Sequence, residues 1–187
     1  MADLLLATEH FDETPDLYGA FPELSEAQIS AVAGRGERET THVGDVLYRE
    51  GDRSYDFIVI LGGKVAVVEG YGSSDQQVVG VHGPRRFLGE ISLLTGQAAF
   101  VTAVVVEAGE VLRIPVEELR ELVTQDTALG DLVLRAYLLR RSILIEVGEG
   151  SMVVRLVHQY LEELVGRDDV RSAPVSRPTS NLVSSAS

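Results

Sequence analysis

The order of apolar and polar positions divides the chain into a central region of short apolar runs and two flanking regions with helical patterns. Between Glu37 and Pro115, β-branched runs alternate with glycines: DVLYRE, FIVIL, KVAVVE, QQVVGV, FVTAVVV and EVLRIP. Runs of this length with glycine turns between them are typical of an antiparallel sandwich or barrel. No helix of crossover length interrupts them, which argues against a parallel α/β sheet. The central region is therefore predicted to be an antiparallel β structure.

The flanking regions are predicted to be helical. The first thirty or so residues have a helical pattern, and Ser25 followed by Gln28 forms a capping box that starts a short helix ending near Ala33. After the strands, PVEELRELVTQ predicts a helix with Pro115 at its first position. Residues 126–147, DTALGDLVLRAYLLRRSILIEV, predict a longer helix. The expected fold class is mainly β with flanking helices.

The long predicted helix has two apolar faces. One stripe packs naturally on the sheet, whereas the second face, with Leu134, Leu138 and Ile145, needs another partner. We expect this helix to be shared across a two-fold dimer. The alternative is a helix buried within its own chain. The residues predicted for the dimer helix are Leu129, Leu132, Val133, Ala136, Leu138 and Ile143.

Composition shifts predict the domain boundaries. We expect an N-terminal extension over residues 1–20, one domain over 21–147, an extra amphipathic helix over 151–166 and a disordered tail over 168–187. The sequence GEGS at 148–151 separates the long helix from the extra one. The extra helix either packs on the domain or docks a partner.

Charge and cysteine content exclude several functional classes. The 187 residues carry a formal net charge of −13, so DNA and anionic membranes are expected to be repelled. The chain has no cysteine, which excludes disulfides, thiolate metal sites and cysteine catalysis. The N-terminus has no basic signal-peptide region, and no apolar run is long enough to span a membrane. We expect a cytoplasmic protein that binds neither nucleic acid nor membrane.

Catalytic and metal-binding patterns are also missing from the sequence. The four histidines, His10, His42, His82 and His158, are scattered without ligand spacing, so no metal site is expected. No nucleophile–base pair or carboxylate dyad can be argued from spacing, so we do not expect an enzyme.

A stretch after Thr41 resembles a known family. GDVLYREGDRSYDFIVILGGKVAVVE, residues 44–69, is similar to the first half of the cyclic-nucleotide-binding domain of catabolite-activator/FNR regulators, protein kinase A regulatory subunits and gated channels. The resemblance covers about residues 20–147 and implies a β jelly roll with N-terminal helices and a long C-terminal helix. The positions that match are Gly44, Asp45, Leu47, Tyr48, Glu50, Gly51, Asp52 and Gly63.

The stretch FLGEISLLTGQAAFVTAVVV, residues 87–106, resembles the family's phosphate-binding cassette. The resemblance implies that backbone N–H groups at a short helix bind the cyclic phosphate, a Glu accepts the ribose 2′-OH, and an Arg pairs with a phosphate oxygen. Glu90 matches, but Ala98 and Ala99 stand where the family has Pro and Arg. The candidate ligand-binding residues, if the function is retained, are Leu88, Gly89, Glu90, Ile91, Ser92, Ala99, Phe100 and Thr102.

The missing arginine weakens the case for a nucleotide receptor. Losing one partner of a desolvated charge pair costs about 2–5 kcal/mol, and Glu90 would be left without a cation. Arg85 and Arg86 are possible substitutes, although a solvated pair in a loop is the simpler interpretation. Lys64, at the start of a run, is expected to be exposed.

We therefore expect a regulatory or interaction module with a degenerate pocket and no required cofactor. One alternative is a cyclic AMP or cyclic GMP receptor with an atypical pocket. Another is a truncated transcription regulator that lacks its DNA-binding domain. The sequence LLTGQAAFVTA is similar to cassettes in proteins where this domain precedes a thioredoxin-reductase-like flavoenzyme, which implies a flavoprotein disulfide reductase as a partner. The chain itself has no G-x-G-x-x-G dinucleotide motif.

Overall fold

The computed structural model describes residues 11–16, 18–91 and 96–148, with side chains as far as Arg140. The chain divides into two compact units, Met1–Arg141 and Ser142–Ser187. All described strands belong to the first unit, and the described part of the second is the end of the last helix. The predicted extra helix at 151–166 and the predicted tail at 168–187 lie outside the described residues.

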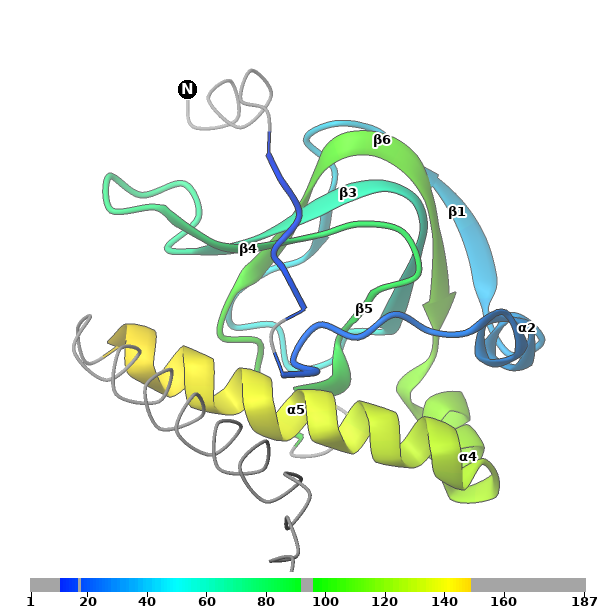
Figure 1. Ribbon diagram of the computed structural model, residues 1–187. Coiled ribbons are helices and arrows are strands. Elements are labelled where there is room, and N and C mark those ends of the chain that lie inside the picture. The colour runs from blue at the N-terminus through cyan, green and yellow to red at the C-terminus, as the bar shows by residue number, and fades with distance from the viewer. Residues whose placement is uncertain (1–10, 17, 92–95, 149–187) are drawn as a thin grey trace, which may run out of the picture. The chain divides into compact units, whose positions relative to one another are not determined.

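The first unit is built on an antiparallel sheet (Figure 1). The strand order is β1-β6-β3-β4, while β2 also pairs with β6 and β5 with β3. The prediction of a mainly antiparallel fold with flanking helices is confirmed. The strands are β1 (Glu37–Thr41), β2 (Val46–Tyr48), β3 (Phe57–Glu69), β4 (Gln77–His82), β5 (Phe87–Leu88) and β6 (Thr102–Ile114).

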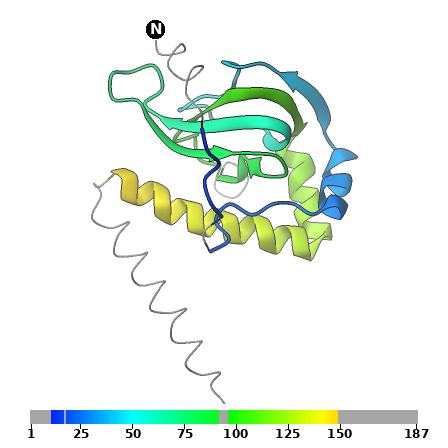
Figure 2. The same cartoon turned by 45° about the horizontal axis from the view of Figure 1, so that its top comes forward.

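Two pairs of predicted strands are continuous in the structure. FIVIL and KVAVVE are both parts of β3, and FVTAVVV and EVLRIP are largely parts of β6. Gly63 has φ of 78°, and a side chain there would overlap the backbone of Glu107 and Ala108 on the paired strand. The register between β3 and β6 shifts around this point. The glycine thus marks a bulge within β3 and not a turn between strands. Figures 1 and 2 show that β3 and β6 curve together along their length.

Strand β1 was not predicted from the sequence. Its residues, ERETT, are polar, and four of the five are exposed. Among the described strands it pairs only with β6. An exposed edge strand buries neither face fully, so it lacks the apolar pattern on which the prediction relied.

Three described helices flank the sheet: α2 (Glu26–Ala33), α4 (Val116–Gln125) and α5 (Thr127–Gly148). Ser25 and Gln28 form the predicted capping box at the start of α2. Pro115 is the residue before the first turn of α4, one position earlier than predicted. Asp126 accepts a hydrogen bond from the Leu129 amide at 3.1 Å and starts α5. These three helix predictions are confirmed.

The prediction of a helical N-terminus is wrong for the described residues before Ser25. Phe11–Asp16 and Tyr18–Phe21, here called the strap, contain no helix. The Thr14 amide donates to the Val81 carbonyl at 2.9 Å, and the Val81 amide donates to the Thr14 hydroxyl at 2.8 Å. These bonds hold the strap beside β4 (Figure 1). They satisfy backbone groups that would be bonded within a helix if the segment were helical.

The helices pack on one end of the sheet around a shared core. Leu129, Val133 and Ala136 are at most 1% exposed within it, and Leu132 packs against it. Leu129, Val133 and Ala136 are thus taken up by the core of their own unit and are not available to a second subunit, whereas the assignment of Leu132 to a dimer interface stays a prediction. Leu138 is 55% exposed, and the Ile143 side chain lies outside the described part. The other core residues are Leu24, Val32, Phe57, Val59, Phe87, Leu112, Ile114, Leu119 and Leu122.

Candidate ligand-binding site

The start of the cassette is held against β3 by its backbone. Leu88 is buried in β5 and pairs with Ile58 of β3. Gly89 follows with φ of 94°, and a side chain there would overlap the Asp56 carbonyl oxygen and lie 3.1 Å from the Phe57 Cα. Glu90 and Ile91 are then helical. Only glycine can adopt this φ and let the backbone lie so close to β3 directly before the helical residues.

Glu90 is buried and paired with an arginine from α5. Its side chain is 3% exposed, and its Oε1 lies 3.0 Å from the Nη1 of Arg140. The Arg140 Nε donates to the Ala20 carbonyl at 2.7 Å, and Nη1 donates to the Phe87 carbonyl at 3.0 Å. The guanidinium also lies over the Phe87 ring, 4.8 Å from its centroid. The expectation that Glu90 lacks a compensating cation is therefore wrong.

Sequence reasoning missed Arg140 because the two residues are far apart in the chain. One signal could have found it. Arg140 follows Leu129, Val133 and Ala136 at intervals of four and three residues, so it continues the buried stripe of α5. An arginine at a stripe position needs a buried partner, and the cassette offers a buried acid.

Two further titratable groups lie in the same interior. Burial raises the pKa of the Tyr48 hydroxyl, and the Glu90 carboxylate raises that pKa further. Burial lowers the pKa of His82 well below its usual value, and the charges of Arg140 and Arg86 add to this effect. Tyr48 and His82 are therefore neutral at physiological pH.

The other end of the cassette is tied to the turn after β2. The Ala99 amide donates to the Asp52 carbonyl and the Ala99 carbonyl accepts from the Gly51 amide, both at 2.8 Å. The Thr102 hydroxyl, predicted as a ligand contact, accepts a hydrogen bond from the Glu50 amide at 3.1 Å. The Thr102 side chain is therefore buried and hydrogen-bonded within the protein, and the Ala99 side chain carries no charge.

The remaining predicted cassette residues differ in exposure. Phe100 is 50% exposed. Ile91 is half-buried. Ser92 lies outside the described residues. Of the predicted cassette residues, Glu90 thus contacts Arg140, whereas Ala99 and Thr102 are hydrogen-bonded to the turn after β2.

The neighbouring basic residues have different environments. Arg85 is 43% exposed at its side chain, pairs loosely with Glu23 and Glu26, and donates from Nε to the Leu24 carbonyl at 3.0 Å. The Arg86 side chain is only 8% exposed, and its Nη1 donates to the Thr14 carbonyl at 2.5 Å. Lys64 is 20% exposed and lies 3.2 Å from Glu107. The interpretation of Arg85 and Arg86 as a solvated pair is wrong for Arg86, and Lys64 is less exposed than expected.

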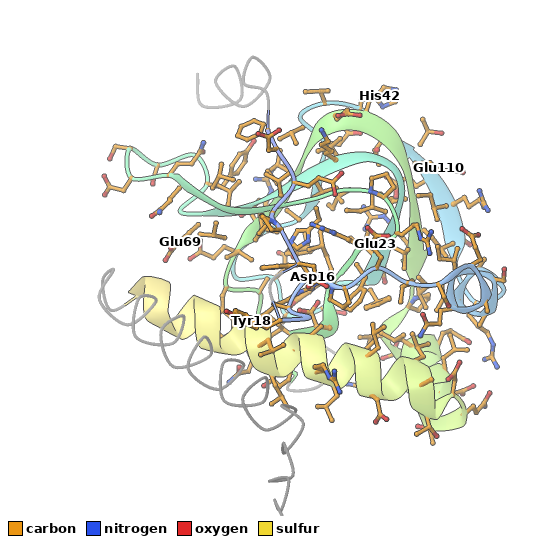
Figure 3. All side chains as sticks on the ribbon, viewed as in Figure 1. Asp16, Tyr18, Glu23, His42, Glu69 and Glu110 are labelled. Atoms are coloured by element: carbon orange, nitrogen blue, oxygen red, sulfur yellow. The ribbon has the colours of Figure 1, made fainter. Side chains whose placement is uncertain are left out.

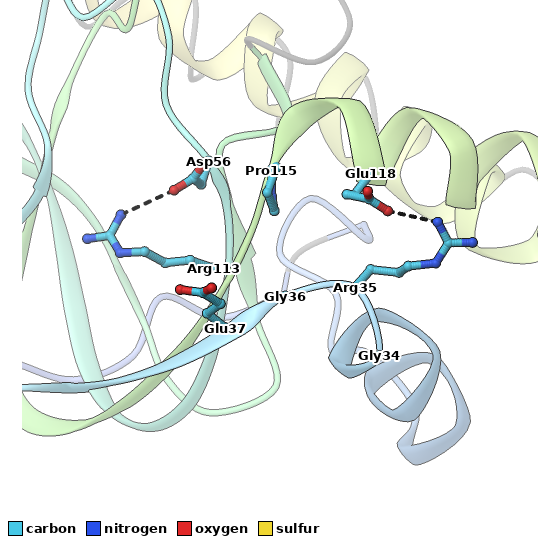
Figure 4. Close-up of a pocket in the computed structure, with 8 residues that line it drawn as sticks. All are labelled: Gly34, Arg35, Gly36, Glu37, Asp56, Arg113, Pro115 and Glu118. Atoms are coloured by element: carbon cyan, nitrogen blue, oxygen red, sulfur yellow. Dashed lines mark hydrogen bonds and ion pairs between the residues drawn. The ribbon is translucent and has the colours of Figure 1, made fainter.

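A separate pocket lies between α2, β1, β6 and α4 (Figure 4). Its volume is about 620 Å³, and it is lined by Gly34, Arg35, Gly36, Glu37, Asp56, Arg113, Pro115 and Glu118. Arg35 bonds to Glu118 at 2.7 Å, and Arg113 lies 3.9 Å from Asp56. Because carboxylates already pair with both cations, the pocket offers little charge to a ligand.

In the part of the chain that the structure describes, no group of three or more His, Cys, Asp or Glu side chains is placed to hold a metal. His42 is exposed and lies 3.5 Å from Asp45, whereas His82 is buried. His10 and His158 lie outside the described residues. None of the described helices has the length and apolar character needed to cross a membrane.

Comparisons with known proteins agree with this fold. Residues 38–126 match the family model of the cyclic nucleotide-binding domain. The structure is similar to the catabolite activator protein of Thermus thermophilus, with 22% identity and a TM-score of 0.55. That match covers 79% of this chain but 63% of the other, so this chain spans less than two thirds of the activator.

A second solved structure comes from work on a cyclic-GMP-dependent signalling pathway in bacterial phytopathogenesis. It is 20% identical, with a TM-score of 0.52, over 63% of this chain and 94% of the other. No curated protein matches the sequence. Residues 38–126 are thus similar to a cyclic nucleotide-binding domain, and the fold resembles that of the catabolite activator protein.

Proposed function

We propose that this chain is a non-catalytic regulatory module whose cassette does not hold a cyclic nucleotide in the family's usual way. The observation that carries this proposal is the buried Glu90 carboxylate, paired at 3.0 Å with Arg140. Ala99 occupies the position at which the family's arginine is expected. The fold therefore supplies a regulatory scaffold, while the charges of its cassette are arranged differently.

Two of the usual nucleotide contacts are weakened by this arrangement. Glu90 would have to accept a ribose hydroxyl, but its side chain is 3% exposed and already bonded. Ala99 cannot pair with a phosphate. Losing one partner of a desolvated charge pair costs about 2–5 kcal/mol, which corresponds to roughly 30- to several-thousand-fold in affinity.

A second candidate function is a cyclic nucleotide receptor in which Arg140 replaces the cassette arginine. The observation that favours it is that Arg140 brings a buried positive charge to the start of the cassette. A ligand that recruited this arginine would have to share it with Glu90.

Calorimetric titration of the full chain with cyclic AMP and cyclic GMP separates the two candidates. We expect no binding at micromolar concentrations for the wild type. The variant Ala99→Arg restores the cation and should gain affinity, whereas Ala98→Arg, with the same charge one position earlier, should not. Micromolar binding by the wild type would exclude the proposed function and favour the receptor.

The regulatory action that we propose is exerted through a dimer and a partner protein. Leu134 and Leu138 are 45% and 55% exposed on α5, while the buried stripe of the same helix packs on its own unit. This exposed face supports a homodimer, in line with the activator-like fold. The resemblance of LLTGQAAFVTA to flavoenzyme-fused cassettes supports a flavoprotein disulfide reductase as the partner.

The partner proposal can be tested with a purified thioredoxin reductase. Its rate of NADPH-dependent disulfide reduction should change when the chain is added in equimolar amount. The Leu134→Glu/Leu138→Glu variant serves as the control for the α5 face. If the rate stayed unchanged even with a large excess of the chain, and size-exclusion chromatography showed no complex, this partner would be ruled out.

A further inference from the structure

Among the described residues, three buried side-chain polar atoms have no hydrogen-bond partner. They are His82 Nδ1, Arg86 Nε and Arg140 Nη2. These atoms come from β4, from the loop before β5 and from α5. A buried polar group without a partner costs about 1–3 kcal/mol, and more if it is charged. The fold therefore keeps hydrogen-bonding capacity in its interior that its own described residues do not use.

The three side chains belong to one interior region. The Phe21 ring lies 5.3 Å from the His82 ring and 5.4 Å from the Arg140 guanidinium carbon. Arg86 and Arg140 are 8% and 7% exposed at their side chains. Both arginine charges also act on His82. The region thus combines two buried guanidinium groups with one neutral imidazole.

The strap covers this region and supplies acceptors to both arginines. The Thr14 carbonyl accepts from Arg86 at 2.5 Å, and the Ala20 carbonyl accepts from Arg140 at 2.7 Å. Glu13 lies 3.8 Å from Arg86, and its carboxylate packs so closely on Gly83 that a side chain there would overlap it. Figure 3 shows Asp16 and Tyr18 further along the same segment. The strap thus offers the oxygen atoms that an anion would otherwise bring.

The charges near the two arginines are incompletely balanced by bonded acids. Glu90 pairs with Arg140 within hydrogen-bonding distance. Among the described acids, Glu13 lies within ion-pair distance of Arg86, at 3.8 Å; it is 35% exposed and too far away for a hydrogen bond. Arg86 also has its Nε free of any described partner. A guanidinium presents Nε and an Nη in a fork that fits two oxygens of one oxyanion.

We propose that Arg86 and Arg140, with His82, form a binding site for the phosphate group of a small molecule, and that Glu13 and Thr14 of the strap compete with that group. Donors that come from three elements surround a tetrahedral oxyanion better than a planar carboxylate. The cations of this site come from outside the cassette. The inference deepens the proposed regulatory function and rests on it, because displacement of the strap would be the signal passed on by the module.

Binding of inorganic phosphate to the full chain tests this site, measured by thermal shift and calorimetry. A ligand that binds only the folded state raises the Tm with concentration. We expect millimolar or tighter binding, and a loss of about ten- to a hundredfold in Arg86→Gln. Arg85→Gln, which removes the adjacent, partly exposed arginine outside the proposed site, is the matched control and should bind as the wild type does. Acetate should bind more weakly than phosphate.

The competitor is tested by Glu13→Gln. This variant removes the strap's carboxylate and should bind phosphate several-fold more tightly than the wild type. Hydrogen exchange of the Thr14 amide, which bonds to Val81 in the free protein, should become faster when phosphate binds. Absence of phosphate binding in both the wild type and Glu13→Gln, or equal losses in Arg86→Gln and Arg85→Gln, would overturn the inference.

The failure of this site and the failure of the proposed function give different results. Micromolar cyclic AMP binding that is abolished by Glu90→Gln but kept in Arg86→Gln would overturn the proposed function. The phosphate titrations of the wild type and Arg86→Gln would then show whether the Arg86 site exists. Micromolar cyclic-nucleotide binding that needs Arg86 and is competed by phosphate would also overturn the proposed function, whereas the phosphate contact at Arg86 would stand.

Discussion

At the residue scale, Gly89 determines how closely the cassette approaches β3. Its φ of 94° and its contact with Asp56 and Phe57 leave no space for a side chain. Gly44 has nearly the same φ, 93°, but a side chain added there would meet no atom within 4 Å. A comparison of alanine substitutions at the two positions therefore separates the energetic cost of the left-handed backbone from the cost of the steric overlap.

We expect Gly44→Ala to lower the free energy of unfolding by about 1–2 kcal/mol, the cost of a left-handed residue. Gly89→Ala should lower it by about 1–3 kcal/mol more, because the added methyl group overlaps the β3 backbone. Urea denaturation followed by circular dichroism measures both. Equal losses in the two variants would contradict the close-contact argument.

Removal of one partner of the Glu90–Arg140 ion pair should lower the free energy of unfolding strongly, because the other charge stays buried without a partner. Arg140→Met leaves a buried carboxylate and should cost about 3–5 kcal/mol in the free energy of unfolding. The double variant Glu90→Leu/Arg140→Met removes both charges, so its loss should be clearly smaller than the sum of the single losses. Additive losses in this cycle would show that the two groups do not interact.

His82 should make the stability depend on pH in the acid range. In the unfolded chain its pKa is about 6.5, whereas burial, Arg140 and Arg86 lower its pKa in the folded chain. The unfolded chain therefore binds the proton first, and the free energy of unfolding should fall as the pH drops below about 6.5. Above that pH this contribution is fully present.

The slope attributable to His82 should reach at most about 1.4 kcal/mol per pH unit. His82→Phe should lose that part of the slope, while His42→Gln, at an exposed site, should keep it. Denaturation curves between pH 5 and pH 8 (roughly the range of histidine titration) provide the measurement. A slope unchanged in His82→Phe would show that the imidazole is not kept neutral by the fold.

At the element scale, α5 has one face that packs within its own unit and another that is exposed. Leu129, Val133 and Ala136 face the core, while Leu134 and Leu138 are exposed. The sequence correctly indicated two apolar faces. It also placed Leu134 and Leu138 on the face that the sheet leaves uncovered, but it assigned Leu129, Val133 and Ala136 to the dimer contact although they pack in the core.

We expect light scattering to give the mass of a dimer for the full chain. The variant Leu134→Glu/Leu138→Glu should be monomeric, since carboxylates replace exposed apolar side chains at the proposed contact. Gln125→Glu adds negative charge at an exposed position of α4 and should stay dimeric. A monomer mass for the wild type would reject the dimer.

At the scale of the whole molecule, the charge distribution disfavours nucleic acid. The formal net charge is −13, and the sequence contains two short basic clusters, Arg85-Arg86 and Arg140-Arg141. In each cluster at least one arginine, Arg86 or Arg140, is buried and bonded inside the first unit. These residues are not available to a DNA backbone, although a small phosphate that displaced the strap would reach them.

We therefore expect no shift of duplex DNA in a gel assay with this chain, even at about 50 mM salt, where phosphate contacts are strongest. A catabolite activator that binds its operator serves as the positive control. A salt-dependent shift would favour the alternative of a truncated transcription regulator.

The sequence by itself determined the local features of this protein. The capping box at Ser25, the helices after Pro115 and Asp126, and the antiparallel runs follow from nearest-neighbour chemistry and periodicity, so they could be predicted without tertiary contacts. The start of the cassette was predicted too, because Gly89 and Glu90 form a local pattern.

Only the tertiary structure decided how the charges are matched. Arg140 lies fifty residues beyond Glu90 in sequence and meets it at 3.0 Å. Arg86 is buried because the strap covers it, and the strap carries no apolar period that would predict its path. Pairing of buried charges depends on which distant segments exclude water together, and no local pattern encodes that. The sequence therefore identified the missing cassette arginine, whereas the fold supplied the cation that Glu90 needs.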